Sequence, residues 1–130
     1  MSKPEGYHTI TPYLMIRDAA AAIEFYKSAF GAIELSRETG ADGRVMHADI
    51  KVGDSHVMIT DESLQFPQMR SVQAFGGSPI NMFLYVDDAD AAARQALAAG
   101  AQLIMEVQDK PYGRSGGVKD PFGLDWWVCS

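Results

Sequence analysis

Apolar residues along the chain recur at two spacings, and the changes between them divide the first half into elements. Residues 9–17 alternate weakly and are rich in strand-forming residues, so they predict a strand. Asp18 then caps a helix that ends at Gly31, with apolar residues at Ala19, Ala22, Ile23, Tyr26 and Phe30. Alternation returns over residues 32–37, 45–52 and 55–60, and Gly53-Asp54 predicts a tight turn between the last two strands.

The same order of elements recurs in the second half. Residues 80–86 predict a strand, followed by an alanine-rich helix that Asp87 or Asp88 caps and Gly100 ends. Further strands are expected at residues 102–107, 116–119 and 124–128. Neither half alone can bury its apolar face, so the repeat predicts one α+β domain over residues 1–130, built from two βαβββ modules. We place module one at about 8–61 and module two at about 80–129.

A polar connection of about 62–79, ending in Gly76-Gly77-Ser78-Pro79, joins the two modules. A connection of this length is unusual inside a compact domain. It is long enough to cross the molecule, to order over a cleft, or to let two chains exchange modules.

The turn at Gly53-Asp54 fixes which side chains share a face of the first sheet. Lys51 lies opposite His56, Asp49 opposite Met58 and His47 opposite Thr60, all on one side. The other side is purely apolar, at Met46, Ala48, Ile50, Val52, Val57 and Ile59. We expect helices to cover the apolar side and the mixed side to line a hollow open to solvent, with His56 at the surface near the hairpin end.

The same alternation places aromatic and polar side chains on mixed faces elsewhere, while Trp126 is expected in the core. Aromatic walls with a few polar groups are typical of small-molecule sites. Alternatively, the aromatics fill a closed barrel interior. The expected ligand-binding residues are Thr11, Tyr13, His47, Asp49, Met58, Asn81, Phe83, Tyr85, Asp125 and Trp127.

Composition narrows the partners. The 130 residues carry 11 basic and 17 acidic side chains, a net charge of −6, which argues against nucleic acid and would favour a cationic ligand. Cys129 is the one cysteine, so no disulfide within the chain is expected. No apolar run approaches a membrane span of roughly 20 residues, and the first residues lack a signal-peptide pattern, so we expect a cytoplasmic protein with no membrane partner.

Several segments in this order resemble the vicinal-oxygen-chelate (glyoxalase, bleomycin resistance protein and dioxygenase) superfamily, and most of all its PhnB-like branch. They are DAAAAIEFYKSAFGA from Asp18, VMHADIKVGDSHVMITDE from Val45, LYVDDADA from Leu84 and DPFGLDWWV from Asp120. The resemblance covers residues 8–129. It implies a pair of curved-sheet half-barrels and a homodimer, but not one function, because functions vary on this scaffold.

The resemblance also implies four metal-ligand positions, which here fall on Thr11, Met58, Asn81 and Trp127. None is a histidine or a carboxylate, the donors that Zn, Ni, Fe or Mn sites use. We therefore expect no cofactor, and a metal-free protein that binds a small aromatic or cationic compound, as the bleomycin-binding relatives do, with a role in antibiotic resistance. The alternative is an enzyme, such as a lyase or isomerase of this superfamily, using His47 as a general base held by Asp49, or an unrecognised metal site.

Overall fold

The computed structural model describes residues 3–130, which form two four-stranded sheets and two helices. The first sheet has the order β1-β4-β3-β2 and the second β5-β8-β7-β6, so each repeats the topology of the other. Within each sheet the first strand runs parallel to the last and the other pairs are antiparallel. The expected α+β fold of two βαβββ modules is confirmed. The strands are β1 (Tyr13–Met15), β2 (Ile33–Thr39), β3 (Val45–Val52), β4 (Ser55–Thr60), β5 (Met82–Tyr85), β6 (Gln102–Lys110), β7 (Gly113–Lys119) and β8 (Asp125–Cys129).

Both helices begin at an aspartate and end at a glycine, as the sequence predicts. Helix α1 (Ala19–Phe30) is capped by the side chain of Asp18, and α2 (Ala89–Ala99) by Asp88, which decides between the two predicted caps. Gly31, at φ 69°, closes α1 in a left-handed conformation that residues with a Cβ rarely adopt. The residues after β4 also support α1, because Asp61 Oδ1 accepts from the backbone N–H groups of Asp18 and Ala19.

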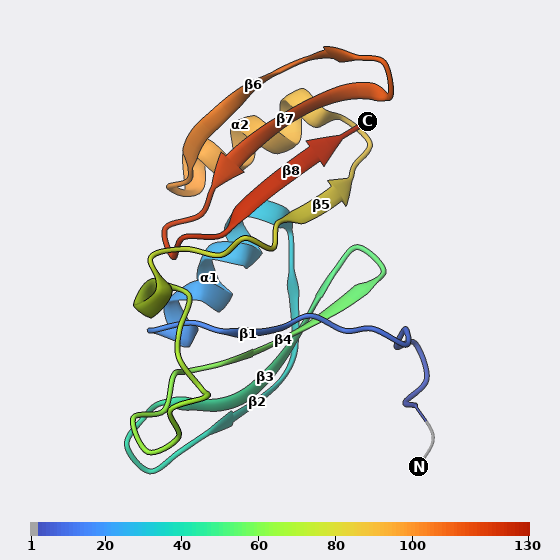
Figure 1. Ribbon diagram of the computed structural model, residues 1–130. Coiled ribbons are helices and arrows are strands. Elements are labelled where there is room, and N and C mark those ends of the chain that lie inside the picture. The colour runs from blue at the N-terminus through green and yellow to red at the C-terminus, as the bar shows by residue number, and fades with distance from the viewer. Residues whose placement is uncertain (1–2) are drawn as a thin grey trace.

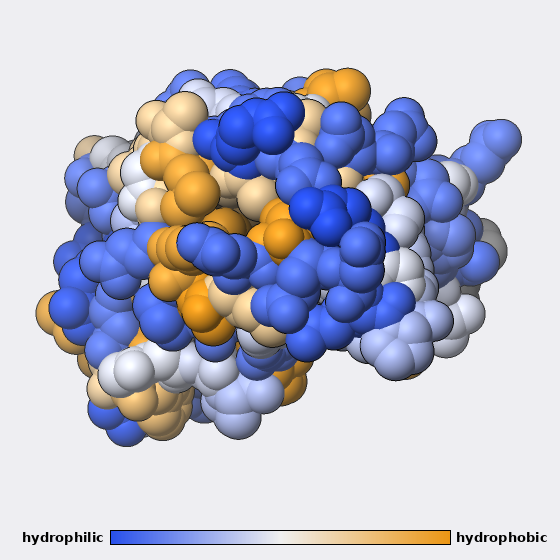
Figure 2. Space-filling model, turned by 90° about the horizontal axis from the view of Figure 1, so that it is seen from above, coloured by the Kyte–Doolittle hydropathy of each residue, from blue (hydrophilic) through white to orange (hydrophobic). Residues whose placement is uncertain are grey.

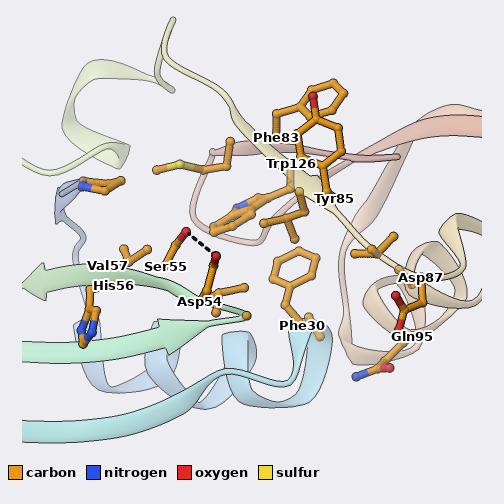
Figure 3. A pocket seen from close by; sticks show the side chains of 18 of the residues that line it. Phe30, Asp54, Ser55, His56, Val57, Phe83, Tyr85, Asp87, Gln95 and Trp126 are labelled. Carbon is orange, nitrogen blue, oxygen red and sulfur yellow. Dashed lines mark hydrogen bonds between the residues drawn. The ribbon is translucent and has the colours of Figure 1, made fainter. Parts of the chain in front are cut away.

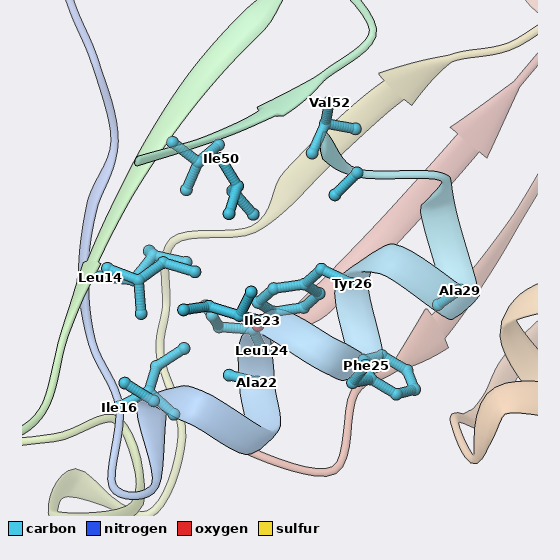
Figure 4. Packing of buried hydrophobic residues seen from close by; sticks show 14 of the residues in the cluster. Leu14, Ile16, Ala22, Ile23, Phe25, Tyr26, Ala29, Ile50, Val52 and Leu124 are labelled. Carbon is cyan, nitrogen blue, oxygen red and sulfur yellow. The ribbon is translucent and has the colours of Figure 1, made fainter. Parts of the chain in front are cut away.

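Helix α1 lies between the two sheets, and α2 packs on the second sheet (Figure 1). The apolar core is continuous through α1, from Ile50 and Ile59 of the first sheet to Leu124 and Trp126 of the second. Figure 4 shows Ile50 and Leu124 together with Ile23 and Tyr26 of α1. Trp126 is 1 % exposed, which confirms its predicted place in the core.

A buried carboxylate also ties the two modules together. Asp120 accepts hydrogen bonds from Tyr26 of α1 at 2.6 Å and from the indole of Trp126 at 2.8 Å. Two backbone N–H groups, of Phe122 and Leu124, complete its partners. Burial and the neighbouring Asp120 raise the pKa of Tyr26 well above its usual value. Since each of these donors bonds to Asp120, the hydrogen-bond network fixes α1 against the β7–β8 turn.

The strand predictions err mainly at the ends of strands. The expected strands at 9–17 and 80–86 shorten to Tyr13–Met15 and Met82–Tyr85, and Ile80 is 70 % exposed. Met46, predicted on the apolar face, is 62 % exposed, whereas Val45 is buried. The cause is a register shift between Glu38 and Thr39, which pairs Thr39 with Val45 and so turns Val45 inward.

Candidate functional site

Corresponding strands of the two sheets carry corresponding rows of side chains on the face away from the helices. In the first sheet Tyr13 lies beside Met58, and Met58 lies beside Asp49. In the second sheet Phe83 lies beside Trp127, and Trp127 beside Gly117. Tyr13 and Phe83 each lie five residues before their helix cap, so the rows occupy equivalent places in the repeat.

The first row ends in a cluster that we call the Asp49 cluster: Tyr7, Asp49 and His56. Tyr7 donates its hydroxyl to Asp49, and its ring stacks on the imidazole of His56 with centroids 3.7 Å apart. His56 Nδ1 lies 3.1 Å from both carboxylate oxygens. An ionised carboxylate only accepts hydrogen bonds, so His56 Nδ1 carries a proton and donates it to Asp49. The bond to Asp49, burial and the carboxylate charge together raise the pKa of Tyr7.

The burial of this cluster corrects two expectations. Asp49 and His56 are only 4 % and 8 % exposed, although the mixed face was expected to open to solvent and His56 to lie at the surface. The N-terminal segment accounts for part of this burial, because Tyr7 lies across both side chains. The structure also pairs Asp49 with His56 rather than with His47, the general base of the alternative enzymatic reading. His47 instead has the ring of Tyr13 as a neighbour, at 6.3 Å between centroids.

The second row carries what we call the aromatic shelf: Phe83, Tyr85 and Trp127. The indole of Trp127 lies directly over Gly117, where an added Cβ would come within 2.4 to 3.0 Å of three ring atoms. Trp127 Nε1 also donates to Asn81 Oδ1 at 2.6 Å, which fixes the in-plane orientation of the ring. Phe83 and Tyr85 extend the shelf, with centroids 5.3 Å apart, and are 46 % and 85 % exposed.

Asp125 stands at the edge of the shelf, where it forms an ion pair with Lys119 at 2.6 Å. Its charge is therefore largely balanced before any ligand arrives. Figure 2 shows a band of apolar side chains on the face seen from above, bordered by polar ones.

A cavity of about 680 Å³ lies elsewhere, at the junction of the modules. The segment 8–12 and the β3–β4 turn line one side, and β5 with the start of α2 lines the other. Trp126 and Phe30 point toward this space, whereas Phe83 and Tyr85 point away from it (Figure 3). Of the ten expected ligand-binding residues, Thr11, Phe83 and Tyr85 border the cavity.

Nine of the ten expected residues therefore fall into two groups, whereas Thr11 precedes β1 and borders the cavity. Tyr13, His47, Asp49 and Met58 share the first face, and Asn81, Phe83, Tyr85, Asp125 and Trp127 share the second. Within residues 3–130, no hydrogen bond or ring contact joins the two groups. The sequence reasoning missed Tyr7 and Gly117. A glycine inside a strand signals close approach of another group and would have pointed to Gly117, whereas Tyr7 precedes the first regular element.

The four positions where the superfamily implies a metal do not fit one. Trp127 and Asn81 satisfy each other through a hydrogen bond, and neither Thr11 nor Met58 supplies an anionic or imidazole donor. Over the described part of the chain, no three His, Cys, Asp or Glu side chains are grouped closely enough to hold a metal ion.

No helix among residues 3–130 is long and apolar enough to cross a membrane.

Known proteins share this sequence and architecture. An uncharacterized protein of Mycobacterium tuberculosis is 40 % identical over 120 residues, which cover 90 % of this chain and 71 % of the relative. The crystal structure of an Arabidopsis thaliana gene product superimposes with a TM-score of 0.77 at 28 % identity, covering 95 % of this chain and 99 % of that one. TnmS3, an antibiotic binding protein from Streptomyces, has the same fold, with a TM-score of 0.70 at 24 % identity over 99 % and 97 % of the two chains.

The sequence profile of one superfamily matches residues 7–128, nearly the whole length of the two-module fold. The chain belongs to the Glyoxalase/Bleomycin resistance protein/Dioxygenase superfamily.

Proposed function

We propose that the protein binds a small planar aromatic compound, without a metal, by stacking it on the aromatic shelf. The observation that carries the proposal is the orientation of Trp127, which Gly117 allows to lie flat and Asn81 holds in place. A ring held in this way loses little freedom on binding, so most of its stacking energy is available to the ligand. That TnmS3 binds an antibiotic on the same fold supports an antibiotic-like ligand and, with it, a role in resistance.

A positive charge on the ligand should help, but not through the carboxylates of Asp49 and Asp125. Asp125 is neutralised by Lys119, and Asp49 is already bound by Tyr7 and His56. The attraction for a cation would instead come from the ring faces of the shelf and from the net charge of −6. The preference for cations should therefore be modest and should weaken in high salt.

The binding experiment compares 9-aminoacridine, a planar cation, with the neutral acridone, by calorimetric titration. Trp127→Ala should weaken both roughly tenfold or more, if stacking and lost contact area together approach ~1.4 kcal/mol. Tyr112→Ala, which removes an exposed aromatic ring on the β6–β7 turn, is the matched control and should change neither affinity. Binding that Trp127→Ala leaves unchanged would reject the shelf as the site.

We further propose that two copies of the chain pair in solution. The short edge strands β1 and β5 are flanked by exposed apolar residues, with Ile10 at 85 %, Tyr85 at 85 % and Ile80 at 70 % exposure. A second copy would cover both edges and would set its own faces against the open faces of the first. Sedimentation at micromolar concentration should give twice the chain mass. Ile10→Glu should shift it toward the monomer, whereas the control Leu64→Glu, at an equally exposed apolar residue in the connection, should not.

Metal independence has its own test. Protein purified without chelators should contain no stoichiometric transition metal by elemental analysis, because the donor set at the four positions does not suit one. One equivalent of zinc, nickel or manganese would contradict this part of the proposal.

A further inference from the structure

Tyr7 occupies the first face in the way that a small bound molecule would. Among residues 3–10, which precede the first strand, Tyr7 is the one residue that is not exposed. Its backbone belongs to a turn with Pro4, and its side chain alone reaches into the Asp49 cluster. The ring is thus a phenol carried by a turn outside the strands and helices.

The slot that receives the ring has two complementary parts. The imidazole of His56 offers a flat surface, inclined by only 20° to the ring of Tyr7. Asp49, at the end of the row Tyr13–Met58–Asp49, offers a buried acceptor to the hydroxyl. An ionised carboxylate accepts hydrogen bonds but has none to donate. The slot therefore selects a ring that carries a hydrogen-bond donor over a ring that does not.

The remaining partners hold the slot in shape without Tyr7. The two oxygens of Asp49 are fixed by His56 Nδ1, which approaches both at the same distance of 3.1 Å.

We propose that Asp49 and His56 form a subsite for a phenolic hydroxyl of the ligand, and that Tyr7 fills this subsite until the ligand displaces it. This inference rests on the proposed function for its ligand class, an aromatic compound, whereas the subsite itself lies on the first face and is separate from the shelf within one chain. The ligand class that follows is a planar aromatic compound with at least one phenolic hydroxyl.

A tethered competitor has a measurable consequence. A free phenol binds only to the fraction of molecules in which Tyr7 has left the slot, so its apparent affinity is lowered by that fraction. Removing the ring of Tyr7 should therefore strengthen the binding of a simple phenol, while the loss of a contact normally weakens binding.

The experiment titrates p-cresol, which is the side chain of tyrosine, and toluene, which lacks the hydroxyl, and follows both by NMR. We expect Tyr7→Ala to bind p-cresol on the order of tenfold more tightly than the wild type, and toluene to show no such gain. The double variant Tyr7→Ala/Asp49→Asn should lose most of the gain, and the control Tyr112→Ala should behave as the wild type. Equal affinity of p-cresol for the wild type and Tyr7→Ala, or equal gains for toluene, would overturn the inference.

A second readout separates displacement from the filling of a hole left by the substitution. In wild-type protein carrying 3-fluorotyrosine, the fluorine resonance of Tyr7, assigned by its loss in Tyr7→Phe, should move toward its solvent-exposed value as p-cresol saturates. A resonance that stays fixed while p-cresol binds would refute displacement. Failure of this inference is distinct from failure of the proposed function, because 9-aminoacridine would still bind in a Trp127-dependent manner.

Discussion

The first and second sheets repeat one topology but use equivalent rows of residues for different purposes. The row Tyr13–Met58–Asp49 ends in a buried carboxylate that Tyr7 and His56 cover, whereas the row Phe83–Trp127–Gly117 ends in a glycine on which an indole lies flat. The first face has satisfied its polar groups within the chain. The second leaves two aromatic rings largely uncovered.

The difference shows how a duplicated unit can divide its tasks. A side chain at position 49 builds a polar contact and closes the face, while the lack of one at position 117 leaves room for a large ring. Both rows lie on sheets that share one core through α1. As long as Asp120 keeps its hydrogen-bond partners in that core, a substitution on one face should leave the other face unchanged.

The largest contrast should lie between the two adjacent tryptophans. Trp126→Phe should destabilise the protein by roughly 2–4 kcal/mol, because it removes buried ring volume and leaves Asp120 without one donor. Trp127→Phe should cost less than about 1 kcal/mol, since its ring borders solvent. Urea unfolding curves of the two variants measure this directly. Equal losses of stability would mean that the shelf is structural.

A smaller effect is expected from Gly117→Ala, which tests the shelf itself. The new methyl group would overlap the indole, so the ring must move, at a cost of roughly 1–3 kcal/mol. The emission spectrum of Trp127 should change, and 9-aminoacridine should bind more weakly.

Gly116→Ala provides the contrast for that variant. Its methyl group would meet Val107 and the carbonyl of Met105 rather than the indole, so stability should fall while the environment of Trp127 is kept. Indole emission that responds equally to both substitutions would contradict the local account.

On the first face, Asp49→Asn should cost on the order of 1 kcal/mol, because bonds to a neutral acceptor are weaker than bonds to a carboxylate. Asp125→Asn on the second face should cost less, since its pair with Lys119 is partly exposed. Thermal unfolding of both variants makes the comparison. A larger loss of stability for Asp125→Asn than for Asp49→Asn would contradict the view that the carboxylate of the first face contributes more to stability.

The smallest effect concerns pH and the residues after β4. The hydrogen bond and charge of Arg17, with the N–H of Ser71, lower the pKa of Glu62 to about 2 from 4.5. A lowered folded-state pKa stabilises the protein above the unfolded value, and this stabilisation is lost as the pH falls from about 4.5 to about 2. Glu62→Gln should flatten the pH dependence of stability in that window, as measured by urea unfolding. An unchanged slope would show that Glu62 is not held by these partners.

The sequence predicted regular elements well and irregular ones poorly. Strand alternation and the Gly53-Asp54 turn gave the register of the β3–β4 hairpin, because side chains on a strand repeat with a period of two. The same rule failed at Met46, where a register shift changes the phase. It could not anticipate the burial of Asp49 and His56, because Tyr7 reaches them from a segment with no periodic pattern.

The candidate site was predicted in parts. Alternation assigned Trp127, Phe83 and Tyr85 to one face correctly, since neighbouring strands pair those positions. It missed that the two faces are separate within the chain and that Asp125 is already paired with Lys119. Lys119 and Asp125 lie opposite each other across the β7–β8 turn, so their pairing follows from the register of that hairpin and not from alternation within one strand.

The central claim, that the shelf binds the ligand through Trp127, can be tested by NMR of the two indole N–H groups. Trp126 donates to Asp120 in the core, and Trp127 donates to Asn81 on the shelf, so one resonance serves as the internal control for the other. On titration with 9-aminoacridine, the Trp127 resonance should shift and saturate, while that of Trp126 stays in place. A shift of Trp126 alone, or of neither resonance at saturating ligand, would contradict the account.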